Sequence, residues 1–176
     1  MNAAGQPRGS VVCEPMTAAT RVHAQRLLGV FLDTDAHYRA SAAQYGDRGA
    51  EALERALDLF LAHPEIGFVW LARTGDAVAG ACVVCYAIST SLGGLVAKLD
   101  DVTVDPERHG QGIGTAMLAA LIRHLRERNV GRIDTACHRE NVGAWGFYRR
   151  QGFRPLDEER IALLIDESSS LQGPTT

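Results

Sequence analysis

The chain has 176 residues, four of them cysteine, and a formal net charge of −3. This length predicts one domain that buries roughly 70% of the surface of its unfolded chain. Charges of both signs are scattered and no run of about 18 apolar residues occurs, so the sequence predicts neither a nucleic-acid surface nor a membrane span.

Both ends of the chain are rich in glycine, serine, proline, asparagine and threonine, without periodicity. We therefore expect flexible tails at 1–10 and 167–176 around a single domain at 11–166. No charged segment followed by an apolar run precedes that domain, which predicts a cytoplasmic protein.

The first third of the chain predicts one strand and two helices. The strand is expected at Val11–Cys13. Apolar residues at helical spacing then predict helices over 22–31 and 53–61, and His63-Pro64 ends the second of them.

Three apolar runs in the middle of the chain predict an antiparallel meander. Phe68–Ala72 and Val78–Ile88 are joined by the tight turn Thr74-Gly75-Asp76, which is typical of a hairpin. After a second turn at 90–94, Leu95–Val104 is expected to return as the third strand.

That third strand leads directly into a glycine-rich turn and a helix. Pro106 prevents the β-branched run at 102–104 from continuing as a strand, and glycine occupies alternate positions over Gly110–Gly114. An apolar helix is expected at Ile113–Arg128. Amide N–H groups at a helix start have no intrahelical partner, so this order of elements predicts an anion site.

The last part of the chain alternates strand and helix. A strand is expected at Ile133–Cys137, a helix capped by Asn141 and ended by Gly152, and a final strand at Ile161–Ile165 that could form an exposed sheet edge. The predicted fold class is α/β of mixed α+β order, without internal repeats.

The glycine turn by itself has other interpretations. A dinucleotide-binding glycine turn is expected in the first strand–helix unit of its fold, whereas this turn lies two-thirds along the chain. A P-loop requires Gly-Lys-Ser/Thr, which the sequence lacks. A turn that only packs its helix against the strand is the structural alternative.

The cysteines have a metal-site alternative. Cys82 and Cys85 have the spacing of half a zinc site, but residues three apart on a strand point to opposite faces and no second pair follows. We expect small buried thiols and no metal. Cys137 and His138 could form a nucleophilic pair, but neighbours on a strand are expected to point apart.

Two motifs in order resemble the GNAT N-acetyltransferase superfamily. The first is a glycine loop after a Val-x-Val-x-Pro strand, and the second is an Asn, Ala, Phe-Tyr, Gly-Phe series about thirty residues later. Here they are Val102 to Pro106 with His109 to Gly114, then Asn141, Ala144, Phe147-Tyr148 and Gly152-Phe153. One departure is His109, preceded by Arg108, at a position where the family has Arg or Gln.

The resemblance implies the GNAT fold, a central, mostly antiparallel mixed sheet that is splayed at the acetyl-CoA strand and flanked by helices on both faces. It implies acetyl-CoA as co-substrate, with its pyrophosphate on the glycine loop, its pantetheine arm along the strand and the Val102 N–H facing the thioester carbonyl. The implied binding residues are Val102, Thr103, Val104, His109, Gly110, Gln111, Gly112, Ile113, Gly114, Thr115, Asn141, Ala144 and Phe147.

The resemblance also implies N-acetylation of a primary amine by direct attack in a ternary complex. The protonated amine needs a base, for which Asp100 and Asp101 are candidates, and Asp100 matches an acidic position of the family's diamine acetyltransferases. Tyr148 matches the family's proton donor to the leaving thiolate. A solvated Asp100 and a Tyr148 that only packs its ring are the structural alternatives.

The acceptor is expected to be a small-molecule amine, polyamine-like or amino-acid-like, and His37, Tyr38 and Tyr45 are candidates for lining its pocket. A CoA-binding sensor without turnover and a protein N-terminal or lysine acetyltransferase are the alternatives, with a nicotinamide oxidoreductase a distant third. Family habit implies a homodimer, and no nucleic-acid or membrane partner is expected.

Overall fold

The computed structural model describes residues 10–36, 38–39, 49–156 and 160–165. Apart from Ser10, both expected tails lie outside these ranges. Within the described residues, no helix is long and apolar enough to cross a membrane.

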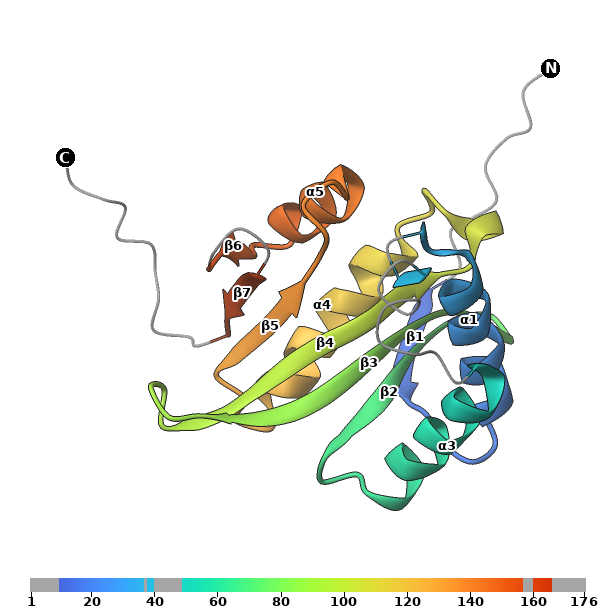
Figure 1. The fold of residues 1–176 in the computed structure, drawn as a ribbon, viewed down its shortest axis with the longest axis horizontal. Coiled ribbons are helices and arrows are strands. Elements are labelled where there is room, and N and C mark those ends of the chain that lie inside the picture. Colours follow the sequence, from blue (N-terminus) through green and yellow to red (C-terminus); the bar gives the residue numbers. More distant parts are fainter. Residues whose placement is uncertain (1–9, 37, 40–48, 157–159, 166–176) are drawn as a thin grey trace.

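A twisted mixed sheet forms the centre of the molecule (Figure 1). Its described strands are β1 (Val11–Pro15), β2 (Gly67–Thr74), β3 (Ala77–Ser89), β4 (Gly94–Val104), β5 (Arg132–Ala136), β6 (Arg154–Pro155) and β7 (Arg160–Leu164), and they lie in the order β1-β2-β3-β4-β5-β7-β6. Within the described sheet, β4 and β5 are the parallel pair and all other neighbours are antiparallel. The predicted meander is confirmed, with Gly75 at φ 61° in the first turn.

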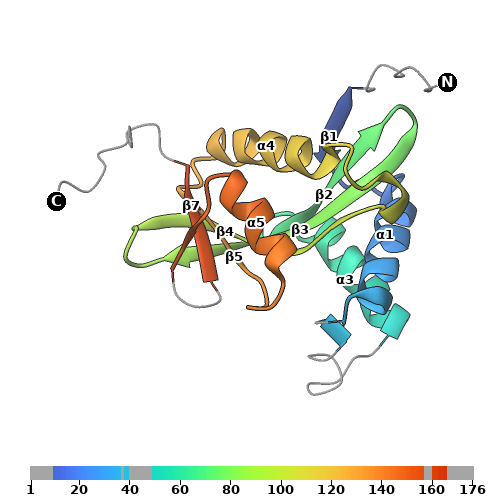
Figure 2. The same ribbon diagram turned by 90° about the horizontal axis from the view of Figure 1, so that it is seen from above.

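Helices cover both faces of the sheet (Figure 2). The pair α1 (Arg21–Thr34) and α3 (Gly49–Ala62) covers one face, and α4 (Ile113–Arg126) with α5 (Val142–Arg150) covers the other. Strand β2 packs against both helix layers, because alternate side chains on a strand point to opposite faces. Val69 and Leu71 pack with α1 and α3, whereas Trp70 and Ala72 pack with α4.

The splay of the sheet begins at Leu99. Strand β4 pairs with β5 only over Val96–Leu99, and Figure 1 shows the two strands diverging beyond this point. On the other side of β4, Ala81 is opposite Thr103 and Val83 opposite Asp100, so β4 carries one extra residue there. This bulge includes Asp101 in the left-handed conformation, at φ 48°. Beyond Leu99, the edge of β4 that faces β5 has no pairing strand among the described residues.

Two sequence predictions need correction. Helix α4 ends at Arg126 rather than Arg128, because Asn129 adopts φ 56°, outside the helical region. The C-terminal strand is not the outermost one, since the two residues of β6 pair with Ala162 and Ile161. Strand β6 was not predicted, since two residues ending in proline carry no periodicity.

Candidate active site

The glycine turn between β4 and α4 has an open backbone. Gly110 and Gly112 adopt φ 75° and 80°, and a Cβ built on either would meet no atom within 4 Å. Gly112 is the N-cap of α4, and the first helical hydrogen bond runs from the Ala116 N–H to its carbonyl, at 3.0 Å. The amides of 113–115 precede that bond, so they lie at the positive end of the helix dipole beside an uncovered surface.

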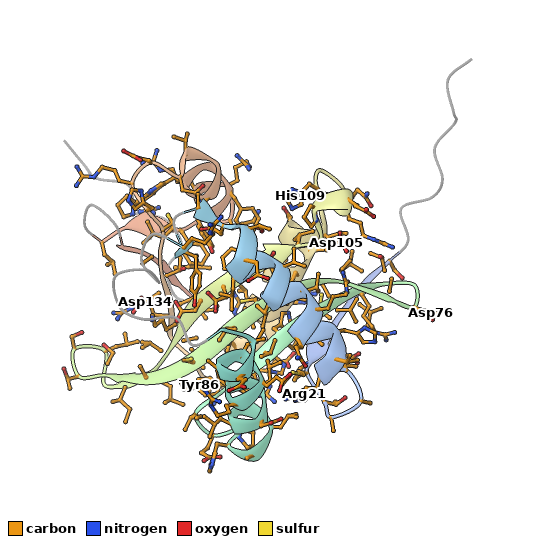
Figure 3. The ribbon with its side chains drawn as sticks, turned by 45° about the vertical axis from the view of Figure 1, so that its right-hand side comes forward. Arg21, Asp76, Tyr86, Asp105, His109 and Asp134 are labelled. Carbon is orange, nitrogen blue, oxygen red and sulfur yellow. The ribbon has the colours of Figure 1, made fainter. Side chains whose placement is uncertain are left out.

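The two basic residues before this turn are held by the sheet. His109 Nε2 contacts the Val104 carbonyl oxygen at 2.9 Å, and Arg108 donates to Thr74 Oγ1 at 2.6 Å. Figure 3 shows His109 beside Asp105 at this end of the molecule. His109 therefore braces the turn against the end of β4, which gives a structural role to the residue that departs from the family motif.

The divergence of β4 from β5 opens a cleft of 430 Å³. It brings together six residues predicted from sequence: Asp100, Asp101, Val102, Asn141, Ala144 and Tyr148. Thr103, Val104 and His109 instead line an adjoining cleft of 630 Å³ between β4 and α1, which shares Val102 with the first. The loop residues 110–115 and Phe147 line neither cleft; Phe147 packs against Gly114 and the Tyr148 ring.

The two carboxylates in the cleft have different surroundings. Burial, followed by the nearby charges of Asp100 and Asp35, raises the pKa of Asp101 from its usual 3.8 to about 6, against an opposing effect of Lys98. Asp100 forms an ion pair with Lys98, at 2.9 Å between Nζ and Oδ2. Asp101 is thus the carboxylate whose proton affinity lies near neutral pH, the range that suits a general base.

Tyr148 is almost completely buried at the base of the cleft. Its ring lies between those of Phe147 and Phe153, each with a centroid distance of 5.2 Å. Burial raises the pKa of the Tyr148 hydroxyl above its usual value, although a hydrogen bond with the Thr135 side chain acts in the opposite direction. The hydroxyl is therefore protonated throughout the neutral range and able to donate.

Sequence reasoning missed five residues of this cleft: Phe31, Asp35, Leu99, Thr135 and Ala136. Thr135 Oγ1 donates to the Leu99 carbonyl at 3.1 Å, where the pairing of β4 with β5 stops. No local pattern distinguishes this threonine from any other strand threonine. Asp35 follows the last residue of α1, and only the packing of α1 on the sheet brings it to the cleft.

The remaining candidates have mixed outcomes. Cys137 and His138 both line the cleft, and β5 ends at Ala136, so strand alternation does not govern how their side chains point. Tyr38 lines the cleft, whereas His37 and Tyr45 lie outside the described residues. Among the described residues, no group of three or more His, Cys, Asp or Glu side chains could hold a metal ion.

Asn141 caps the helix that carries Tyr148. Its Oδ1 accepts from the Ala144 N–H at 3.0 Å, as the sequence predicted. We expect Asn141→Ala to lower the free energy of unfolding by about 1 kcal/mol and Asn141→Asp to preserve it, because aspartate also caps. Urea denaturation measures both, and equal stability of the alanine variant and the parent would contradict the capping role.

Comparison with known proteins agrees with this geometry. A model of the acetyltransferase (GNAT) family matches residues 31–153. An uncharacterized N-acetyltransferase of Methanocaldococcus jannaschii is 34% identical over 89 residues, covering 51% of this chain and 39% of that protein. Serotonin N-acetyltransferase 2 of Oryza sativa is 35% identical over 114 residues, covering 65% of this chain and 52% of that protein. The chain thus spans about half or less of the length of these curated relatives.

Solved structures share the fold. A protein of Salmonella typhimurium described as an acetyltransferase, solved with its cofactor acetyl-CoA, superposes with a TM-score of 0.68 at 14% identity, over 91% of this chain and 96% of that one. Glucosamine-6-phosphate N-acetyltransferase of Arabidopsis thaliana gives 0.62 at 15% identity, over 84% and 94%. With the splayed sheet and the glycine turn, the match over 31–153 shows that this chain belongs to the GNAT family of acetyltransferases.

Proposed function

We propose that the domain at 11–166 is an N-acetyltransferase that transfers the acetyl group of acetyl-CoA to a primary amine of a small molecule, by direct attack in a ternary complex. The observation that carries this proposal is the bulge at Asp101, which separates β4 from β5. It leaves a carboxylate, a strand edge and a buried phenol around one cleft.

The residues present fit acetyl-CoA. The amides of 113–115 begin α4 next to the open turn at Gly110 and Gly112, and they suit the pyrophosphate. The edge of β4 over 102–104, beyond its pairing with β5, offers main-chain groups to the amides of the pantetheine arm, as an added strand would. The Val102 N–H then stabilises the negative charge that develops on the thioester carbonyl oxygen during attack. Acetyl-CoA supplies the activated acetyl group.

Two side chains then move the protons. Asp101, ionised above pH 6, takes a proton from the ammonium group of the acceptor, directly or through water. The neutral nitrogen forms its bond to the carbonyl carbon as the C–S bond breaks. Tyr148 donates its hydroxyl proton to the departing sulfur, and the resulting phenolate regains a proton from the newly bonded nitrogen, directly or through water. Asp101 releases its proton to solvent.

Release of free CoA thiol tests the proposal. The full chain, incubated with acetyl-CoA and a panel of primary amines, is expected to release thiol in proportion to an N-acetylated product seen by mass spectrometry. If calorimetry shows that the protein binds acetyl-CoA but no amine in the panel is acetylated, the protein is instead a CoA-binding sensor.

The Asp101→Asn variant tests whether Asp101, rather than Asp100, is the general base. In the parent, kcat/KM for the amine is expected to rise with pH through a midpoint of about 6, as Asp101 loses its proton. We expect the variant to lose that rising limb and about 100-fold or more in turnover. Asparagine tolerates the left-handed backbone at this position, so the bulge should persist. If kcat/KM of the variant still rises with pH through about 6, Asp101 is not the general base.

The Asp101→Asn variant is expected to lose activity but to gain folding stability at neutral pH. Because the folded pKa of Asp101 lies above its usual 3.8, the native state binds the proton more tightly, and this group's contribution to stability is lost as pH rises from about 4 to 6. At pH 7 the variant should therefore be more stable than the parent, by about 1 to 3 kcal/mol. At pH 3 the difference should vanish, which denaturation at both pH values can check.

A further inference from the structure

A second cavity, of 480 Å³, is lined by residues of α1, α3, β3 and β4, and Tyr148 is not among its described lining residues. Its walls are apolar: Leu28 from α1, Leu53, Ala56, Leu57 and Phe60 from α3, and Val83 from β3. Among the described residues that line it, the charged ones are Asp100 and Asp101, and none is basic.

This apolar cavity meets the active-site cleft at three residues. Tyr38, Asp100 and Asp101 line both spaces. In a regular strand Asp100 and Asp101 would point to opposite faces. The left-handed backbone of Asp101 in the bulge breaks that alternation, so the two carboxylates stand together where the spaces join.

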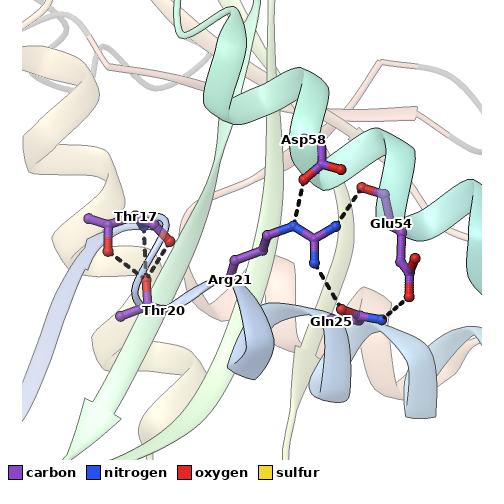
Figure 4. Close-up of polar contacts among 6 residues, drawn as sticks. All are labelled: Thr17, Thr20, Arg21, Gln25, Glu54 and Asp58. Carbon is purple, nitrogen blue, oxygen red and sulfur yellow. Dashed lines mark hydrogen bonds and ion pairs between the residues drawn. The ribbon is translucent and has the colours of Figure 1, made fainter.

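The two helices above the cavity are tied to each other. Arg21 of α1 donates to Asp58 Oδ1 at 2.6 Å and to the Glu54 carbonyl at 3.1 Å, both in α3 (Figure 4). Gln25 also donates to Glu54 Oε1, at 2.8 Å. These contacts fix α1 against α3, and the cavity is already present in the structure without a bound amine.

We propose that the acceptor is a primary monoamine with an apolar body, an alkylamine or arylalkylamine, whose body occupies the apolar cavity and whose ammonium group lies between Asp100 and Asp101. This deepens the proposed acetyl transfer and rests on it. The carboxylates attract the cation and hold its nitrogen at the junction with the cleft, while the apolar walls bind the rest of the molecule.

The lining argues against the two acceptor types expected from sequence. A polyamine would carry a second ammonium among Leu53, Ala56 and Phe60, where none of the described lining residues offers a further carboxylate, and burial of an unpaired charge is costly. An amino acid would bring its carboxylate to Asp100 and Asp101, which carry like charge, and none of the described lining residues is basic; Lys98, outside the lining, is already paired with Asp100.

Matched amine pairs test this directly, with CoA thiol release at saturating acetyl-CoA as the readout. From propylamine to hexylamine, kcat/KM should rise by about fourfold for each methylene that is buried. Hexylamine should exceed 1,6-diaminohexane, and 2-phenylethylamine should exceed phenylalanine, each by about tenfold or more. Equal or reversed preference within these pairs overturns the proposal.

A variant that fills the cavity provides a second test of the acceptor proposal. Ala56→Leu should raise KM for hexylamine and 2-phenylethylamine by about tenfold or more, because the leucine side chain would occupy the space that the body of these amines needs. Ala50→Leu is the matched control, since Ala50 is an exposed residue of the same helix. An unchanged KM in a folded Ala56→Leu protein overturns the assignment of the cavity.

Failure of this inference and failure of the proposed function are distinguishable. If ethylamine and hexylamine both fail to release thiol, acetyl transfer to amines is itself wrong. If diamines or amino acids turn over at least as well as their apolar partners, acetyl transfer stands and the acceptor class is wrong.

Discussion

Replacement of Gly112 by valine should raise the dissociation constant of CoA by about 100-fold or more, because φ 80° at this N-cap is strongly disfavoured for a β-branched residue. Relief of that strain rotates the peptide units that aim the amides of 113–115. Any side chain would also project into the open space at Gly112, where a Cβ would meet no atom within 4 Å. Isothermal titration with CoA measures the loss.

Gly93→Val is the matched control for Gly112→Val. Gly93 has φ 69° and equally open surroundings, but it lies in the turn between β3 and β4. It should carry a similar cost in folding stability and leave the CoA dissociation constant unchanged. His109→Ala, which removes only the brace to Val104, should weaken binding by less than about tenfold. Unaltered CoA binding by a folded Gly112→Val protein would refute the phosphate cradle.

Replacement of Tyr148 by phenylalanine should lower kcat by about 100- to 10,000-fold, the range in which a general acid contributes. The dissociation constant of acetyl-CoA should not change, because the variant loses only the hydroxyl. The ring stays packed between Phe147 and Phe153, and Thr135 keeps its bond to Leu99, so the stability loss should stay below about 1.5 kcal/mol. Single-turnover kinetics with a fixed amine measure the chemical step.

Tyr86→Phe is the control for Tyr148→Phe. Tyr86 lies in β3, half-buried against Phe68 and away from the cleft, and it also loses one hydroxyl. It should retain parental turnover. Because the pKa of Tyr148 is raised above its usual 10, the parent should also show no alkaline loss from this group below pH 10. Full activity of Tyr148→Phe would leave the tyrosine with a packing role only.

The order of elements could be predicted because it depends on short-range physics. Alternation along β2 divides its side chains between two helix layers, the glycines of the turn permit positive φ, and Asn141 caps its own helix. Each signal lies within a few residues of the structure it specifies. The glycine turn was predicted in its place for the same reason, and His109 departed from the motif without disturbing it.

The choice between the two candidate bases could not be made from sequence. Asp100 and Asp101 are the same residue type in adjacent positions, and Asp100 alone matched a family position. The pKa of Asp101 is raised by burial within the bulge and by Asp35, a residue 66 positions earlier in the chain. Burial and charge proximity are sums over neighbours that the folded chain brings together, so they carry no local signature.

The sequence by itself determined α1, α3, α4 and α5, every strand of the described sheet except β6, the glycine turn and the family. Backbone preference and side-chain periodicity act over neighbouring residues, which is why these features could be predicted. The tertiary structure decided where β4 leaves β5, which carboxylate is buried, and that an apolar cavity between α1 and α3 adjoins it. These depend on packing between residues far apart in the chain, and they set the acceptor that we propose.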